Sequence, residues 1–170
     1  MQRRQFIMLG LAAGATLATG LTLYPMLAGA DKNQQQRDAS LVLDALLPAI
    51  LLGALPTAEA EQQQALRSTR QAVLDYLPFL PKRQQAELQQ LFFLLSQQLT
   101  RLALTGHVLT LGELSLEQRL QLLSSWRDSY LQLLQQAYHG LRELLLAAYY
   151  GQPAHWQVLA YTAPEFRAYE

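Results

Sequence analysis

Apolar residues recur at three- and four-residue steps through most of the chain after residue 30, the spacing that places them on one face of an α-helix. Leu, Gln and Ala dominate this part, and no stretch alternates apolar and polar residues as a half-buried strand would. The glutamine pairs fall between the apolar positions and are interpreted as an uncharged solvent face. The pattern predicts an all-α fold: an up-and-down bundle of about four main helices, in one domain of residues 31–170.

Breaks in the pattern divide the first half of this domain into two predicted helices. The first spans residues 37–52 or 40–52, and Pro48 is expected to kink it or end it early, because proline lacks the N–H donor of a helix interior. Thr57 is expected to cap the second helix, since its hydroxyl can accept a hydrogen bond from the first turn. That helix is expected to stop near Tyr76, just before a proline.

Two further helices are predicted in the second half. Pro81 suits the first turn of the third helix, which Gly106 closes. Ser115 begins the longest predicted element, about 35 residues that end at Gly151, and the order Ser-Leu-Glu-Gln at its start fits a capping box. One more turn is expected over residues 154–159. An apolar stripe marks the third helix: Leu88, Leu91, Phe92, Leu95, Leu99 and Leu102.

The first 30 residues differ in composition from the rest of the chain. Arg3 and Arg4 are followed by Phe6 and Ile7, and then by a stretch without charged residues that extends to Leu27. A basic pair ahead of a mildly apolar segment is typical of a twin-arginine export signal. Because that route carries proteins that have already folded, we expect a periplasmic location, with the twin-arginine translocase as one partner.

The end of this leader resembles a cleavage site. Ala28 and Ala30, one residue apart, supply the small side chains that a signal peptidase accepts, and Asp31 would begin the mature chain. The alternative is an uncleaved membrane anchor, because residues 6–27 are long enough to cross a hydrocarbon core of about 30 Å. The two alanines favour cleavage.

Charge and composition exclude several classes of function for the remaining domain. Two of the 13 Lys and Arg residues lie in the leader, which leaves 11 against 13 Asp and Glu. This slightly acidic balance argues against a nucleic-acid partner, which requires a basic face. The chain has no cysteine, so thiolate metal sites, iron–sulfur clusters and cysteine nucleophiles are excluded.

The sequence contains no recognisable catalytic or metal-binding motif. Phosphate loops, nucleophile elbows and H-E-x-x-H are missing, and all three methionines lie in the leader. His107, His139 and His155 are the only histidines, and a haem or metal site would need two of them to converge. The favoured interpretation is three separate histidines. We therefore expect a non-catalytic protein with no cofactor or metal of its own.

Aromatic residues surround the end of the last long predicted helix. Tyr149, Tyr150 and Trp156 lie on either side of Gly151 and Pro153. Either these rings fold back and seal the bundle, or they form a patch for a partner, because Tyr and Trp anchor protein interfaces. Both interpretations remain open from the sequence.

A second candidate patch lies in the middle of the same predicted helix. Trp126 and Arg127 stand beside Asp128 and Tyr130, which allows a buried ion pair at a functional surface. A solvated Arg127–Asp128 face next to a core tryptophan is the favoured interpretation.

The run Tyr150-Gly151-Gln152-Pro153-Ala154-His155-Trp156 resembles the Y-G-x-P-x-x-W ending of a known family. These are the small, twin-arginine-signalled subunits of flavin-dependent sugar, sugar-acid and polyol dehydrogenases, the gluconate 2-dehydrogenase subunit 3-like proteins. The resemblance extends to residues 126–129, 88–102 and 46–56. It departs at Ala160-Tyr161-Thr162-Ala163-Pro164, where the family often has a Gly-Tyr-Pro-Gly-Pro turn, so the geometry of this turn is in question.

The resemblance implies an escort function. In such complexes the catalytic subunit is a large glucose-methanol-choline-type oxidoreductase that holds FAD and has no export signal, and a multi-haem cytochrome c subunit often takes the electrons. The small subunit binds the large one, supports its maturation and carries it through the twin-arginine route. The residues expected at the partner interface are Trp126, Arg127, Tyr149, Tyr150, Gly151, Pro153, Trp156 and Tyr161. The alternatives are a stand-alone periplasmic bundle that binds a cofactor or apolar ligand, and a membrane-tethered structural bundle.

Overall fold

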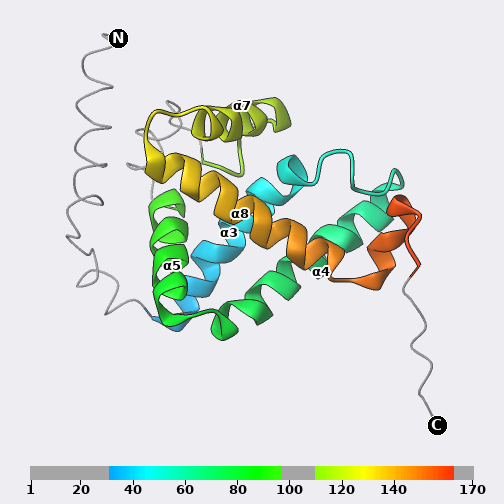
Figure 1. Ribbon diagram of the computed structural model, residues 1–170, viewed down its shortest axis with the longest axis horizontal. Coiled ribbons are helices and arrows are strands. Elements are labelled where there is room, and N and C mark those ends of the chain that lie inside the picture. The colour runs from blue at the N-terminus through cyan, green and yellow to red at the C-terminus, as the bar shows by residue number, and fades with distance from the viewer. Residues whose placement is uncertain (1–30, 97–109, 163–170) are drawn as a thin grey trace.

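The computed structural model describes residues 31–96 and 110–162, and every regular element in these two ranges is helical (Figure 1). The predicted all-α helical bundle is confirmed, with five α-helices in the described ranges in place of about four. The elements are α3 (Lys32–Ile50), α4 (Glu59–Tyr76), the 3₁₀ turn η1 (Leu77–Phe79), α5 (Lys82–Ser96), α7 (Leu116–Arg127), α8 (Gln132–Tyr150) and the 3₁₀ segment η2 (Pro153–Leu159).

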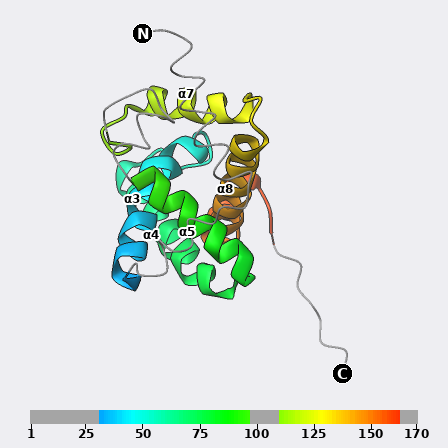
Figure 2. The same cartoon turned by 90° about the vertical axis from the view of Figure 1, so that its left-hand side faces the viewer.

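Helix α3 forms the centre of the bundle. It packs against α4, α5, α7 and α8, and its buried residues occupy more than one face. Helix α7 lies across one end of the bundle in both views (Figures 1 and 2). The core that these helices enclose is one cluster, and its largest fully buried side chains include Trp126, Tyr149, Phe92, Leu43, Leu46 and Leu47. Because this cluster joins all five helices, the chain folds as one unit around α3.

The beginning of α3 corrects the predicted first helix. Asp31 is the N-cap, and its carboxylate accepts from the backbone N–H of Asn33 at 3.3 Å, so the helix begins several residues before the predicted start. The glutamine run that follows is helical. Pro48 lies inside the last turn, where the helix continues only to Ile50, and Gly53 then takes a left-handed conformation with φ of 85°.

The start of α4 differs from the prediction at one residue. Thr57 does not cap this helix: Ala58 occupies the N-cap position, with extended backbone and no side-chain hydrogen bond. The hydroxyl of Thr57 is therefore one residue too early to reach the first turn. Glu59 and Glu61 do lie in that turn, where carboxylates interact favourably with the helix dipole. The predicted end at Tyr76 is confirmed.

The predicted third helix is confirmed as α5, which begins directly after Pro81. Phe92 and Leu95 are buried, and Leu88 and Leu91 pack against the core. The rest of the stripe and the closing Gly106 lie outside the described residues.

The single long helix predicted from Ser115 to Gly151 is wrong. Its predicted capping box is present, because Ser115 and Gln118 exchange hydrogen bonds of 3.2 and 2.8 Å. However, α7 ends at Arg127, and α8 begins four residues after Asp128. Ser129 holds the break, because its hydroxyl accepts from the N–H of Leu131 at 3.1 Å. The chain therefore turns between two helices, and Gly140 lies inside α8.

Candidate partner interface

Tyr149 lies in the core at the end of α8. Its hydroxyl donates to the carbonyl of Ala54 at 2.7 Å, which ties α8 to the connection between α3 and α4. Its ring stacks on His155, with 3.9 Å between the ring centroids. Burial raises the pKa of Tyr149 because the phenolate loses hydration, and the neighbouring Tyr150 adds to the shift. Tyr149 therefore remains a neutral hydrogen-bond donor that seals the bundle.

Residues after Tyr149 fold back on the helix end. Gly151 is the C-cap of α8, and a Cβ at this position would lie 2.8 Å from the carbonyl oxygen of Ala147. Pro153 begins η2, which confirms the predicted extra turn. The indole N–H of Trp156 donates to the carbonyl of Tyr150 at 2.6 Å. The rings of Tyr150 and Trp156 are only partly buried, so this segment seals the bundle and also offers aromatic surface.

The turn after η2 contains a residue in the left-handed region. Ala160 takes a left-handed conformation with φ of 49°, and the N–H of Tyr161 donates to the carbonyl of Trp156 at 3.3 Å. This combination is a Schellman-type helix end, in which glycine is the preferred residue. The ring of Tyr161 is exposed and contacts Trp156 edge to face at 5.2 Å. The alanine side chain at this left-handed position therefore introduces strain at Ala160.

This strain gives a testable prediction. Ala160→Gly is expected to raise the free energy of unfolding by about 1 kcal/mol, because glycine adopts positive φ without a Cβ clash. The matched control is Ala154→Gly, an exposed residue inside η2 with ordinary backbone geometry, which is expected to lower stability by about 0.5–1 kcal/mol. Urea unfolding of both variants measures the difference. Equal effects at the two positions would contradict the strain at residue 160.

Trp126 and Arg127 lie at the opposite end of α8 from this aromatic segment (Figure 1). Trp126 is 1% exposed and belongs to the core, so this predicted interface residue is not available on the surface. Arg127 forms a bidentate ion pair with Asp128 at 2.8 Å, and both side chains are exposed. Those hydrogen bonds raise the pKa of Arg127 and lower that of Asp128. The favoured interpretation, a solvated pair beside a core tryptophan, is confirmed.

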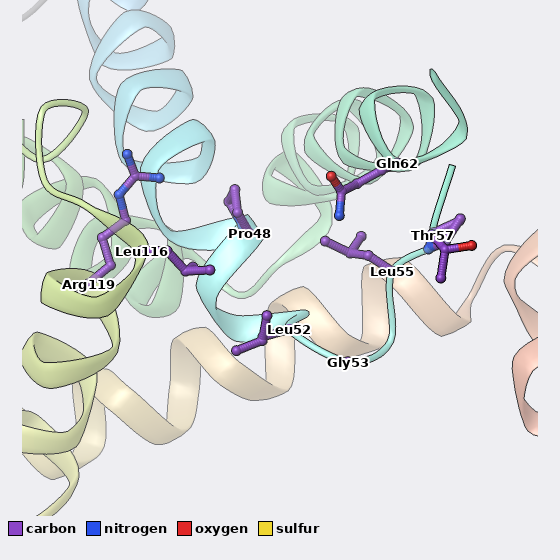
Figure 3. A pocket seen from close by; sticks show the side chains of 9 residues that line it. Pro48, Leu52, Gly53, Leu55, Thr57, Gln62, Leu116 and Arg119 are labelled. Carbon is purple, nitrogen blue, oxygen red and sulfur yellow. The ribbon is translucent and has the colours of Figure 1, made fainter. Parts of the chain in front are cut away.

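A groove that the sequence did not predict lies where three segments meet. We call it the α3–α4 groove; its volume is about 400 Å³, and it is lined by Pro48, Leu52, Gly53, Leu55, Pro56, Thr57, Gln62, Leu116 and Arg119. Figure 3 shows Leu55 and Gln62 pointing toward Pro48 from one side and Leu116 approaching from α7 on the other. Leu52 and Leu116 are both exposed, although each is a large apolar residue. The groove therefore combines these two leucines with the polar side chains of Thr57, Gln62 and Arg119.

Arg119 fixes one wall of the α3–α4 groove. Its guanidinium donates to the carbonyl of Ala45 at 3.0 Å and to the carbonyl of Gly112 at 2.9 Å. These bonds hold the start of α7 against α3. On the other side, Tyr149 binds the carbonyl of Ala54 and so joins the α3–α4 connection, which also lines the groove, to the end of α8. The groove and the exposed part of the aromatic segment thus flank one fixed connection, and together they form the candidate interface.

The two histidines in the described residues lie apart. His139 is exposed on α8, and His155 is buried with its Nδ1 at 2.8 Å from the carbonyl of Tyr149. His107 lies outside the described residues. No group of three His, Asp or Glu in residues 31–96 and 110–162 is placed to hold a metal ion.

The export-signal residues Arg3, Arg4, Phe6 and Ile7 lie outside the described residues, as do the two alanines of the predicted cleavage site. Within the part of the chain that the structure describes, none of the helices has the length and apolar character required to cross a membrane. No protein-family model, curated protein or solved structure matches this chain.

Proposed function

We propose that this chain is a non-catalytic small subunit that binds a large FAD-dependent oxidoreductase of the glucose-methanol-choline type, helps it mature and escorts it through the twin-arginine route. The observation that carries this proposal is the leader, with Arg3 and Arg4 ahead of an apolar stretch. An export signal for folded proteins is required when a cofactor enters its protein in the cytoplasm. The partner then reaches the periplasm with its FAD, where a multi-haem cytochrome c subunit accepts the electrons.

The α3–α4 groove supports this proposal as the place where the large subunit binds. Leu52 is 56% exposed and Leu116 is also exposed, and both lie beside proline and leucine side chains. Permanent complexes bury larger and more apolar surfaces than transient ones. The neighbouring Trp156 and Tyr161 add aromatic surface of the kind that anchors interfaces.

Co-purification tests both the partner and the groove. A tagged full chain expressed in its native host is expected to bring down a large flavoprotein, identified by mass and by its flavin absorbance. Leu52→Asp is expected to lower the recovered flavoprotein about tenfold or more, because burying an unpaired carboxylate in an apolar contact costs several kcal/mol and each 1.4 kcal/mol is a factor of ten. The variant should keep its melting temperature, since Leu52 is exposed.

The matched control is Leu41→Asp. Leu41 is 62% exposed on α3 and does not line the groove, so recovery of the flavoprotein should be unchanged. Equal losses of flavoprotein with both variants would contradict the assignment of the α3–α4 groove as its binding site. Purification of the chain alone, with a haem absorption band or a bound apolar molecule, would contradict the escort function and favour the stand-alone bundle.

A further inference from the structure

Exposed aromatic side chains gather at the end of the bundle where the chain passes from α4 to α5. Phe79 is 81% exposed and Tyr76 is also exposed. Figures 1 and 2 both place this α4–α5 link at the same end of the bundle as the first turn of α3, where the described chain begins. Neither ring belongs to the α3–α4 groove or to the aromatic segment after α8.

The backbone holds these rings outward. Pro78 lies in η1, which is closed by a 3.3 Å hydrogen bond from the N–H of Leu80 to the carbonyl of Leu77. The side-chain amide of Gln85 then donates to the carbonyl of Pro78 at 2.9 Å and to that of Leu80 at 2.6 Å. The fixed φ of proline and these bonds reduce the entropy that the link would lose on binding. Phe79 is therefore presented to the outside on a fixed turn.

The charges at this end are of both signs: Lys32 and Lys82 lie among the exposed carboxylates of Asp31 and Asp75. Lys32 and Lys82 are exposed and form no ion pair within residues 31–96 and 110–162. Nearby Arg83 is neutralised by Glu87 at 2.9 Å, and Asp75 accepts from a glutamine amide at 2.8 Å. Aromatic rings beside unpaired lysines are the combination found at the interface between a bilayer and water.

The leader is attached to the chain at this end of the bundle. Residues 6–27 carry no charge and number enough to cross a hydrocarbon core of about 30 Å. Only three residues separate Leu27 from Asp31, and an extended chain advances at most about 3.6 Å per residue, so the first turn of α3 lies within about 15 Å of Leu27. While residues 6–27 span a bilayer, this end therefore lies within reach of its surface.

We propose that this end of the bundle, defined by Lys32, Tyr76, Phe79 and Lys82, contacts the phospholipid surface while the leader is attached. Phe79 and Tyr76 enter the headgroup region, and the two lysines lie against lipid phosphates. The contact goes beyond the escort function. It orients the folded domain so that the α3–α4 groove, which α7 and the start of α4 line, remains open to a protein partner.

A single fluorescent label tests this orientation directly, because the chain has no cysteine and one introduced cysteine is unique. The full chain carrying Phe79→Cys with a polarity-sensitive dye is bound to vesicles of phosphatidylethanolamine and phosphatidylglycerol. The dye emission is expected to shift to shorter wavelength, and a nitroxide on the lipid headgroup is expected to quench it at least twofold. Tyr76→Cys keeps the Phe79 ring and should report the same contact.

The control is Tyr130→Cys in the α7–α8 link, at the opposite end of the bundle in both views and fully exposed. Its dye is expected to remain in water and unquenched. Equal quenching at residues 79 and 130, or a dye at both 76 and 79 that stays in water, would overturn the contact. Shielding at residue 79 that requires an added dehydrogenase would assign this end to a protein instead. The vesicles contain no partner subunit, so this result is independent of the escort function.

Discussion

Trp126→Ala is expected to lower the free energy of unfolding by about 3–5 kcal/mol, the usual cost of removing a large ring from a packed core. Trp126 is 1% exposed in the last turn of α7 and belongs to the single core cluster. A domain of this size has a total stability of about 5–15 kcal/mol, so the variant would lose a large fraction of it. Urea unfolding followed by circular dichroism measures the change, since helix content reports on the whole fold.

Trp126→Phe is the matched control. The indole Nε1 of Trp126 is buried and has no hydrogen-bond partner among the described residues. Phenylalanine leaves a smaller cavity than alanine and also removes this unpaired N–H, whose burial costs about 1–3 kcal/mol. We therefore expect stability within about 1 kcal/mol of the parent chain. If Trp126→Ala kept its stability but lost the flavoprotein, Trp126 would be an interface residue and the core assignment would be wrong.

The helices could be predicted from the sequence because periodic leucines and strong helix formers act over many residues. The break between α7 and α8 could not, because Leu133, Leu134 and Leu141 continue the helical spacing past it. Local hydrogen bonds decide this break: Asp128 pairs with Arg127, and Ser129 binds the first turn of α8. Polar residues in sequence between two apolar runs were the available signal, since Asp and Ser favour helix ends.

Helix ends were predictable where proline or glycine marks them, as at Tyr76 and Gly151, or where a side chain caps its own helix. Ser115 and Gln118 do so, and their capping box was read correctly from four residues. Thr57 was misplaced because the connection to α4 extends one residue further, and the packing of that connection fixes its length. Tyr149 contributes to this packing through its bond to Ala54, a contact between residues far apart in the chain.

The candidate interface was predictable only where its residues are close together in sequence. The aromatic segment after α8 is contiguous in sequence, so Tyr150, Trp156 and Tyr161 could be singled out together. The α3–α4 groove depends on Leu52, just after α3, and Leu116, at the start of α7, which the fold brings together. Periodicity alone assigns both leucines to the core. Their exposure follows from position, since one lies just beyond a helix and the other is the first residue of a helix.

If the proposed escort function holds, changing Arg3 and Arg4 together to Lys leaves both this chain and the dehydrogenase proposed as its partner in the cytoplasm. Lysine keeps the positive charge but lacks the planar guanidinium, whose paired donors a receptor can bind in one geometry. Cell fractionation, with immunoblots for this chain and dehydrogenase activity toward an artificial electron acceptor, measures the loss in the periplasm. Arg142→Lys is the control, because Arg142 is exposed on α8, outside the candidate interface, and its conservative change should leave export intact.

A second variant separates the export route from the binding of cargo. Leu52→Asp keeps the leader, so this chain should still reach the periplasm, while the dehydrogenase that it no longer binds should remain in the cytoplasm. The doubly substituted leader should retain both proteins, although they still co-purify from the cytoplasm. A dehydrogenase that reaches the periplasm despite Arg3→Lys and Arg4→Lys would require its own signal, and this chain would then not be its escort.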